Sequence, residues 1–257
     1  MVRAWLLAIF LFCGAAQAAP AVRYCDYPVY PPISWSDGKQ VRGLAPTVVK
    51  AVFARLGLDV EVVVLGNWKR CLMDAAQGRV DVVLAYRTPE REATLAFAEV
   101  PVLREEVAVF YNRQRPLQVD KLEDLKRYRG GLLFGESYGE AFDQIVAHAG
   151  NIEWVSDSRQ NFGKLIRGRI DFIPYERRTG LLYIEHLPGG ADIRALPLTL
   201  AVDHLRLAVS RHSPLAARKA EIDAELQRLA DGGEIERWLA ESEATYRDMV
   251  AQPEFRP

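Results

Sequence analysis

The chain of 257 residues is poor in cysteine and histidine and carries almost no net charge. It has 3 cysteines and 4 histidines, and neither an HExxH motif nor a CxxC pair occurs. We therefore expect no metal and no cofactor. Lys and Arg total 33 against 34 Asp and Glu, which gives a formal charge of −1. This balance excludes the basic surface that is typical of nucleic-acid-binding proteins, so no nucleic acid is expected as a partner.

No apolar run of membrane-spanning length occurs in the chain beyond its first residues. These residues have the three parts of a secretory signal peptide: Arg3, the apolar stretch 5–12, and the cleavage motif Ala16-Gln17-Ala18. We predict that residues 1–18 are a signal peptide and that the remainder is soluble, exported and periplasmic.

Two cysteines, Cys25 and Cys71, remain after that cleavage. An even number of cysteines in an oxidising compartment favours a disulfide between them. Two separately buried thiols are the alternative.

Short apolar segments alternate with helical segments whose ends can be recognised. Gly57 and Gly78 follow helical patterns, Asn67 can cap a helix over 68–77, and Ser213-Pro214 is typical of a helix start. This alternation predicts an α/β fold with largely parallel sheets. The expected strands are 59–65, 80–85, 106–111, 132–134, 170–173 and 205–209.

One segment of the chain returns after about 90 residues. Gly78-Arg79-Val80-Asp81 is echoed by Gly168-Arg169-Ile170-Asp171, and a strand and a helix are expected before each copy. We interpret the repeat as two similar lobes, with coincidence as the alternative. Lobe one takes 20–104 and 202–257, and lobe two takes 105–201. Open α/β sheets bind ligands at the carboxyl ends of their strands. If these ends face each other in the two lobes, a ligand lies in a cleft between them.

Gly135-Glu136-Ser137-Tyr138-Gly139 fits the G-x-S-x-G pattern of a hydrolase nucleophile elbow. No HGGG-type segment precedes it, so we favour a local interpretation. In that interpretation Ser137 caps a helix and Glu140 completes a capping box. The free backbone N–H groups of such a turn suit a carboxylate or a phosphate.

Aromatic side chains follow the first expected strands. Tyr27, Tyr30 and Trp35 lie in a proline-rich loop, and Trp68 begins the next helix. Aromatic residues in loops are typical of the walls of a ligand cleft. Ordinary packing of the loop is the alternative.

An arginine follows the repeated strand in the first copy, and an acid ends the matching strand in the second. Thr88-Pro89 predicts a helix start that puts Arg91 in the first turn, where a cation opposes the helix dipole. A bidentate contact with a ligand carboxylate would explain this position, against the alternative of a solvated side chain. Glu176 follows the matching strand, so an arginine and an acid could face each other as an amino acid requires.

Taken in order, these segments resemble the extracellular solute-binding proteins of family 3, the polar amino-acid type that serves ABC importers. The resemblance runs from about Val22 to Tyr246. It rests on segments 30–35, 43–44, 55–57, 67–70, 78–81, 88–91, 122–125, 168–171 and 231–234, and on Trp238.

The resemblance implies a two-lobed clamshell, the type II periplasmic binding protein fold, with two crossings between lobes and closure by hinge bending. Each lobe would be a mostly parallel sheet flanked by helices. It also implies roles: Tyr30 and Trp68 would sandwich the ligand, and Arg91 would bind its carboxylate. The N–H groups of Ser137 and Tyr138 would help Arg91, and Glu176 would take the ammonium group.

Three features depart from the family pattern. Glu176 stands where Asp is usual, and the segment between Asp81 and Arg91 is about two residues shorter. Tyr86 and Arg87 stand where small hydroxyl residues are usual, which would shrink the pocket or favour an acidic ligand.

We therefore predict a monomeric binding protein that captures an amino acid or a related carboxylate and delivers it to a membrane permease. No residue is expected to be catalytic. A dehydratase resembling cyclohexadienyl dehydratases and a sensory receptor are the alternatives on the same fold. The predicted ligand-binding residues are Tyr30, Trp35, Trp68, Tyr86, Arg87, Arg91, Ser137, Tyr138 and Glu176.

Overall fold

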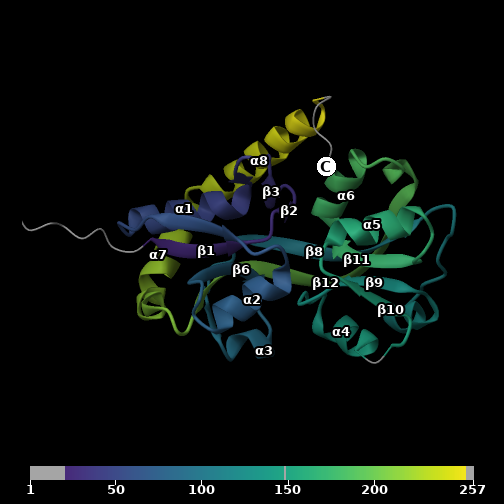
Figure 1. Ribbon diagram of the computed structural model, residues 1–257, viewed down its shortest axis with the longest axis horizontal. Helices are drawn as coiled ribbons and strands as arrows, with labels where there is room; N and C mark the ends of the chain where they lie inside the picture. Colours follow the sequence, from purple (N-terminus) through teal and green to yellow (C-terminus); the bar gives the residue numbers. More distant parts are fainter. Residues whose placement is uncertain (1–20, 148, 253–257) are drawn as a thin grey trace, which may run out of the picture.

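The structure is a computed structural model that describes residues 21–147 and 149–252. The predicted signal peptide, residues 1–18, lies outside the described residues. The described chain forms two lobes joined by two neighbouring strands, β8 (Leu103–Asn112) and β12 (Ile193–Ser210), as Figure 1 shows. The two-lobed α/β fold predicted from the sequence is confirmed.

Lobe one has three parallel strands at its centre: β5 (Val60–Val64), β1 (Val22–Asp26) and β6 (Val82–Tyr86). A short strand, β7 (Leu95–Phe97), pairs with β12, and a small separate sheet contains β2 (Val29–Tyr30), β3 (Ser34–Ser36) and β4 (Val41–Arg42). The helices are α1 (Leu44–Arg55), α2 (Trp68–Ala76), α3 (Pro89–Glu92), α7 (Lys219–Asp231) and α8 (Glu234–Val250), with the 3-10 helix η3 (Pro214–Arg218).

Lobe two repeats this plan with the parallel strands β10 (Ile152–Val155), β9 (Gly130–Leu133) and β11 (Phe172–Glu176). Its helices are α4 (Glu140–Val146), α5 (Ser158–Ile166) and α6 (Arg177–Glu185), with the 3-10 helices η1 (Leu122–Arg127) and η2 (Gly190–Asp192).

The two crossing strands connect the lobes into one continuous sheet of order β10-β9-β11-β8-β12-β6-β1-β5. β8 is antiparallel to β11, β12 is antiparallel to β6, and β8 and β12 are antiparallel to each other. The sheet is therefore parallel within each lobe and antiparallel only where the chain crosses between lobes.

The internal repeat is visible as a repeated pair of hydrogen bonds. In lobe one the Asp81 carboxylate accepts from Arg23 N at 2.9 Å, and Asp81 N donates to Arg23 O at 2.8 Å. In lobe two Asp171 makes the same two bonds with Arg129, at 2.9 and 2.8 Å. The repeated aspartate thus ties the start of one strand to its neighbour in both lobes.

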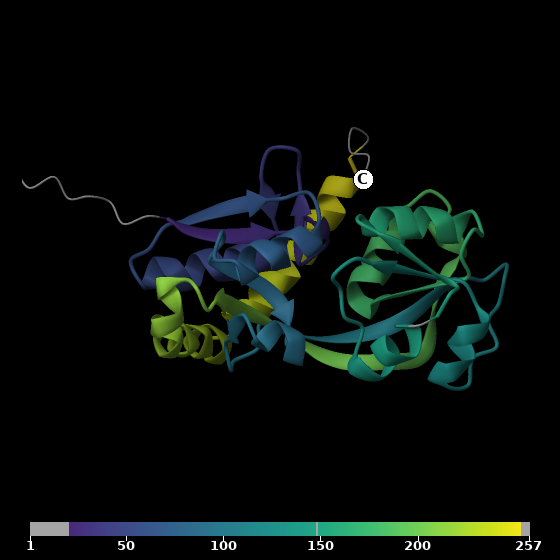
Figure 2. The same ribbon diagram turned by 60° about the horizontal axis from the view of Figure 1, so that its bottom comes forward.

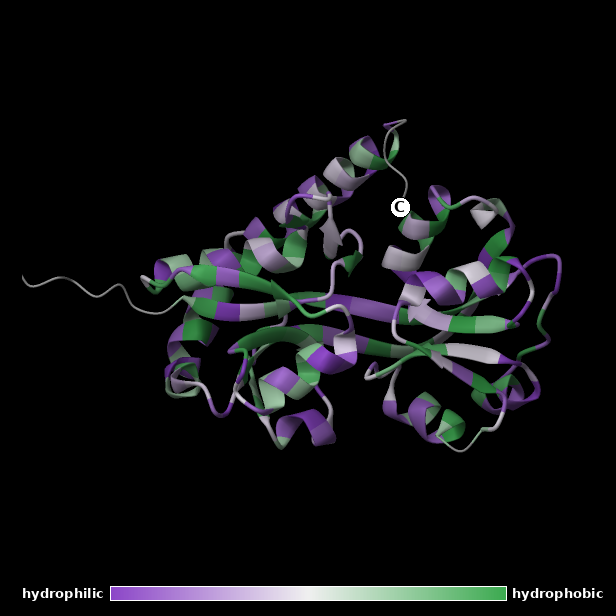
Figure 3. Ribbon diagram, in the orientation of Figure 1, coloured by the Kyte–Doolittle hydropathy of each residue, from purple (hydrophilic) through white to green (hydrophobic). Residues whose placement is uncertain are grey.

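Apolar side chains cover both faces of the sheet in each lobe. In lobe one, α1, α7 and α8 pack on one face and α2 on the other. In lobe two, α5 and α6 cover one face, and α4 and η1 cover the other. In Figure 3 the strands within the lobes carry hydrophobic stretches, the part of β8 that crosses between the lobes is hydrophilic, and the helices alternate between polar and apolar positions.

Three of the predicted helix starts are confirmed. Asn67 Oδ1 accepts from the backbone three residues on at 2.9 Å, and Thr88 Oγ1 accepts in the same way at 3.2 Å. Ser213 caps η3, with Pro214 as its first residue. Among the described residues, no helix has the length and apolar character needed to cross a membrane.

The capping box expected at Ser137 and Glu140 is wrong. Helix α4 begins at Glu140, and Gly139 is its N-cap residue. Ser137 Oγ donates instead to Asp143 Oδ2 at 2.6 Å. The carboxylate of Asp143, one turn into the helix, therefore organises this turn.

Candidate ligand-binding site

A pocket of about 70 Å³ lies between the lobes. Strands β1, β6 and β11 end at it, with Asp26, Tyr86 and Glu176 as their last residues. This is the edge at which open α/β sheets bind ligands. Among the described residues that line the pocket there is no Lys, Arg or His; the aromatic and acidic ones are Tyr24, Tyr27, Tyr30, Tyr86, Tyr138, Tyr175, Trp68, Asp26, Glu136 and Glu176.

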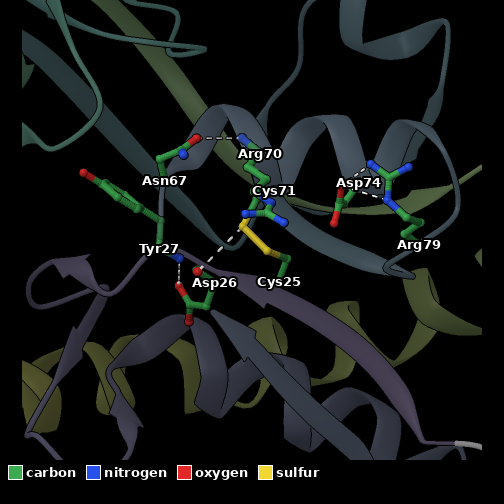
Figure 4. The surroundings of a disulfide bond; sticks show 8 residues. All are labelled: Cys25, Asp26, Tyr27, Asn67, Arg70, Cys71, Asp74 and Arg79. Carbon is green, nitrogen blue, oxygen red and sulfur yellow. Dashed lines mark hydrogen bonds and ion pairs between the residues drawn. A yellow bond between two sulfur atoms is a disulfide. The ribbon is translucent and has the colours of Figure 1, made fainter. Parts of the chain in front are cut away.

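The predicted disulfide between Cys25 and Cys71 is confirmed, with Cα atoms 5.7 Å apart. Figure 4 shows that it joins the end of β1 to α2. Asp26 and Tyr27 directly follow Cys25, and Trp68 lies one turn before Cys71. The disulfide therefore fixes together two of the elements that form the lobe-one wall of the pocket.

Glu176 is the acidic group that the sequence placed in this pocket, and only 4% of it is exposed. Its Oε1 accepts a hydrogen bond from Tyr86 OH at 2.9 Å, and Tyr86 OH lies 3.1 Å from Tyr30 OH. Burial, followed by the nearby carboxylate of Glu136, raises the pKa of Glu176 to about 8. A cation bound beside Glu176 would favour its ionised form.

A second buried acid, Asp26, lines the lobe-one side of the pocket and is 5% exposed. Its Oδ1 accepts from Tyr27 N at 2.7 Å. The hydroxyl groups of Ser34 and Tyr24 also hydrogen-bond to this carboxyl group and lower its pKa, but burial has the larger effect and raises the pKa of Asp26 to about 6. The Asp26 carboxyl group is therefore held by groups of lobe one.

Arg91 is buried between the lobes but does not line the pocket. Its Nη1 donates to Tyr86 O at 2.8 Å, and its Nη2 donates to Gly135 O at 2.8 Å. The same Nη2 lies 3.2 Å from Glu136 Oε1, and the guanidinium carbon lies 5.9 Å from the Trp68 ring centre. Its polar contacts are all with groups of the protein itself. On its other side Arg91 borders a larger outer cavity of about 610 Å³.

The backbone N–H groups expected to help Arg91 are also bonded within the protein. Ser137 N donates to Glu136 Oε1 at 3.0 Å, and Tyr138 N donates to Asp143 Oδ1 at 3.0 Å. The Tyr138 ring lines the pocket, whereas Ser137 faces the outer cavity.

Trp35, predicted to bind the ligand, is not among the residues that line this pocket. Trp35 is 3% exposed and packs edge-on against Tyr246 of α8, with ring centres 5.5 Å apart. Leu182 of α6 completes the cluster. Strand β3 directs this ring toward the C-terminal helix, which covers it; nothing near Trp35 in the sequence indicates that contact.

Arg87, also predicted to bind the ligand, does not line this pocket either. Arg87 is exposed, forms an ion pair with Glu92 and lies 3.4 Å from Glu99. Tyr86, the last residue of β6, lines the pocket. Arg87, the next residue, lines the outer cavity. Neighbouring residues of an extended segment point in opposite directions.

Several lining residues were not predicted from the sequence, among them Asp26, Glu136 and Tyr175. Asp26 is the last residue of a strand in lobe one, as Glu176 is in lobe two. This position at the end of a strand could have identified Asp26 as a pocket residue. Glu136 lies within the G-x-S-x-G segment, where the pattern drew attention to Ser137. The described residues contain no group of three or more acidic, histidine or cysteine side chains arranged to hold a metal ion.

Solved structures share this architecture. An ancestral arginine-binding protein bound to arginine superposes with a TM-score of 0.76 at 19% identity, covering 88% of this chain and 99% of that one. AbpA, an amino acid ABC transporter substrate-binding protein from Streptococcus pneumoniae bound to L-arginine, gives 0.75 at 18% identity over 90% and 96%. A histidine kinase sensor domain with similarity to periplasmic binding proteins gives 0.75 at 19% identity over 86% and 95%.

The sequence itself assigns the family. No curated protein matches the chain by sequence. Residues 22–241 match the profile of the bacterial extracellular solute-binding proteins, family 3, which is most of the chain. The chain belongs to family 3 of the bacterial extracellular solute-binding proteins.

Proposed function

We propose that this solute-binding protein captures a small ligand with a positively charged amino group in the pocket between its lobes. One observation carries the proposal: Glu176 is buried there among tyrosine rings, and no cationic side chain is present among the described lining residues. A buried carboxylate is expensive unless an opposite charge accompanies it. A ligand ammonium group would supply that charge.

The aromatic rings support the same ligand chemistry. Tyr30 and Trp68 line the pocket from lobe one, and Tyr138 and Tyr175 line it from lobe two. Aromatic faces attract cations and cover the apolar part of a small ligand. The neighbours bound to arginine make an amino acid or a related amino compound the natural class to test first.

The wider role follows from the family. We place the protein in the periplasm as a monomer that delivers its ligand to the permease of an ABC importer and catalyses no reaction. Residues 20–104 with 202–257 would form lobe one and residues 105–201 lobe two, so that the crossings fall in β8 and β12. Because a sensor domain is among the structural neighbours, a receptor that signals instead of importing is the second candidate.

A thermal-shift screen of cationic, zwitterionic, neutral and anionic compounds tests this proposal. A ligand at a thousandfold excess over its Kd stabilises the folded protein by about 4 kcal/mol. We expect stabilisation only by compounds with a positively charged amino group. Stabilisation by dicarboxylates or sugars alone would contradict the proposed ligand class, and turnover of prephenate or arogenate would contradict the absence of catalysis.

A further inference from the structure

The groups that would receive a ligand carboxylate are already bonded to carboxylates of the chain. Glu136 Oε1 lies 3.2 Å from Arg91 Nη2 and accepts from Ser137 N at 3.0 Å. Asp143 Oδ1 accepts from Tyr138 N. The two side chains thus make the contacts that an amino acid's carboxylate would be expected to make.

Arg91 has little freedom to exchange these partners. It is 8% exposed, and its two shorter hydrogen bonds, both 2.8 Å, go to the backbone carbonyls of Tyr86 and Gly135. These carbonyls belong to different lobes, so the guanidinium also bridges the lobes. An incoming carboxylate would have to displace Glu136 and leave it buried without its cationic partner, which is unfavourable.

The pocket on the inner side of Glu136 suits a cation alone. It presents the carboxyl groups of Asp26, Glu136 and Glu176 among aromatic rings. The carboxyl groups of Asp26 and Glu176 can accept N–H donors of such a cation. Its volume of about 70 Å³ is about half that of an engineered cavity of roughly 150 Å³ that holds benzene, so the group it encloses must be small.

We propose that the pocket binds a small organic cation without a carboxylate, because Glu136 already fills the place that a ligand carboxylate would take between Arg91 and the Ser137 N–H. This inference rests on the proposed function and sharpens it. The ligand is then an amine or methylated amine whose cationic nitrogen lies among the tyrosines beside Glu176. Glu136 is a specificity-determining residue that excludes α-amino acids.

Matched pairs of an amine and its parent amino acid test the inference by titration calorimetry at pH 8. Suitable pairs are ethanolamine with serine, cadaverine with lysine, and agmatine with arginine. We expect at least one amine to bind, and to bind at least tenfold more tightly than its amino acid. An amino acid that binds as tightly as its amine would overturn the inference and leave the proposed function standing. Absence of binding by every member of the panel would overturn both.

Substitution of Glu136 tests the mechanism. Glu136→Ala frees Arg91 and the Ser137 N–H, so amino-acid affinity is expected to rise at least tenfold while amine affinity falls. Glu140→Ala removes the same charge from an exposed position four residues on and should change neither affinity by more than twofold. If the alanine variant does not fold, Glu136→Gln, which keeps the size, should lower the preference for the amine at least threefold. An unchanged preference in a folded Glu136 variant contradicts the inference.

Discussion

At the scale of single residues, the site depends on how one carboxyl group is buried. The carboxyl group of Glu176, at the end of β11, is shielded from water. The hydrogen bond from Tyr86 OH replaces only part of the lost hydration. Glu136 lines the same pocket, and its carboxylate disfavours the ionised form of Glu176 as well. Without a ligand, the buried carboxyl group therefore raises the free energy of the folded protein. A bound cation would lower it.

This burial predicts a pH dependence of affinity. Because the pKa of Glu176 is raised to about 8, the free protein holds Glu176 largely protonated at pH 6. A cation binds the carboxylate form, so binding at that pH must first remove a proton. For a ligand whose amine stays charged, affinity should rise by up to about tenfold between pH 6 and 7 and level off above about pH 8.

Titration calorimetry at several pH values measures this slope. The groups that face Glu176 are Tyr86, Glu136 and, from β8, Glu105, whose pKa burial raises to about 7. Asp26, with a pKa of about 6, adds to the slope near the acidic end. In Glu176→Gln the slope should be smaller. An affinity that is constant or falls from pH 6 to 8 would show that the carboxylate is not the form that binds.

At the scale of elements, many helix and strand boundaries could be predicted because they depend on interactions between residues close together in the sequence. Caps such as Asn67 and Thr88 act within three residues, and the repeated Asp81 and Asp171 end turns of the same form. The misplaced residues depend on contacts that the local sequence does not encode. Trp35 is covered by Tyr246 from the far end of the chain, and the turn at Ser137 is organised by a carboxylate from α4.

The same distinction explains which site residues were found. A strand end identified Glu176, since parallel strands direct their last residues toward one edge. The family resemblance identified Tyr86. Neither spacing nor residue type could show that Glu136 would take the partners expected for the ligand, because that contact joins two lobes across 45 residues of sequence.

The disulfide between β1 and α2 provides an element-scale prediction. Its cysteines are 46 residues apart, and closing a loop of that length in the unfolded chain stabilises the folded state by about 4 kcal/mol in the entropic account. We expect reduction to lower the free energy of unfolding by about 2–4 kcal/mol, measured by denaturant titration with and without reductant.

The double variant Cys25→Ala, Cys71→Ala is the matched control for that measurement. It should have the stability of the reduced protein and be insensitive to reductant. Ligand affinity should also fall in both, because the bridge fixes Trp68 relative to Asp26. An oxidised protein whose unfolding midpoint does not move on reduction would contradict this account.

At the scale of the whole molecule, the described lobes contact each other both near the pocket and away from it. Near the pocket, Arg91 and Tyr86 of lobe one bond to Gly135 and Glu176 of lobe two. Elsewhere α8 of lobe one reaches α6 of lobe two, as its slanted course in Figures 1 and 2 shows. There Arg178 pairs with Glu243 at 2.8 Å, and the cluster of Trp35, Leu182 and Tyr246 is buried.

The contact of α8 predicts an effect on lobe closure. Tyr246→Ala removes a ring that is 2% exposed from the cluster that joins the lobes. Loss of an aromatic contact of about 1 kcal/mol from the closed form should weaken ligand affinity about fivefold. Small-angle X-ray scattering of the ligand-free variant should show a larger radius of gyration. Tyr246→Phe keeps the ring and should behave as wild type; a Tyr246→Ala protein with unchanged affinity and dimensions would contradict this.

The most direct test of the central claim is calorimetric titration of the best cationic ligand into Glu176→Gln at pH 8. The variant keeps the size of the side chain and removes the buried charge, so we predict that the Kd rises about 100-fold, in the range expected for loss of a buried charge pair. Glu153→Gln, which removes an exposed charge from the same lobe, should bind as wild type. A folded Glu176→Gln protein with a Kd within twofold of wild type would contradict the account.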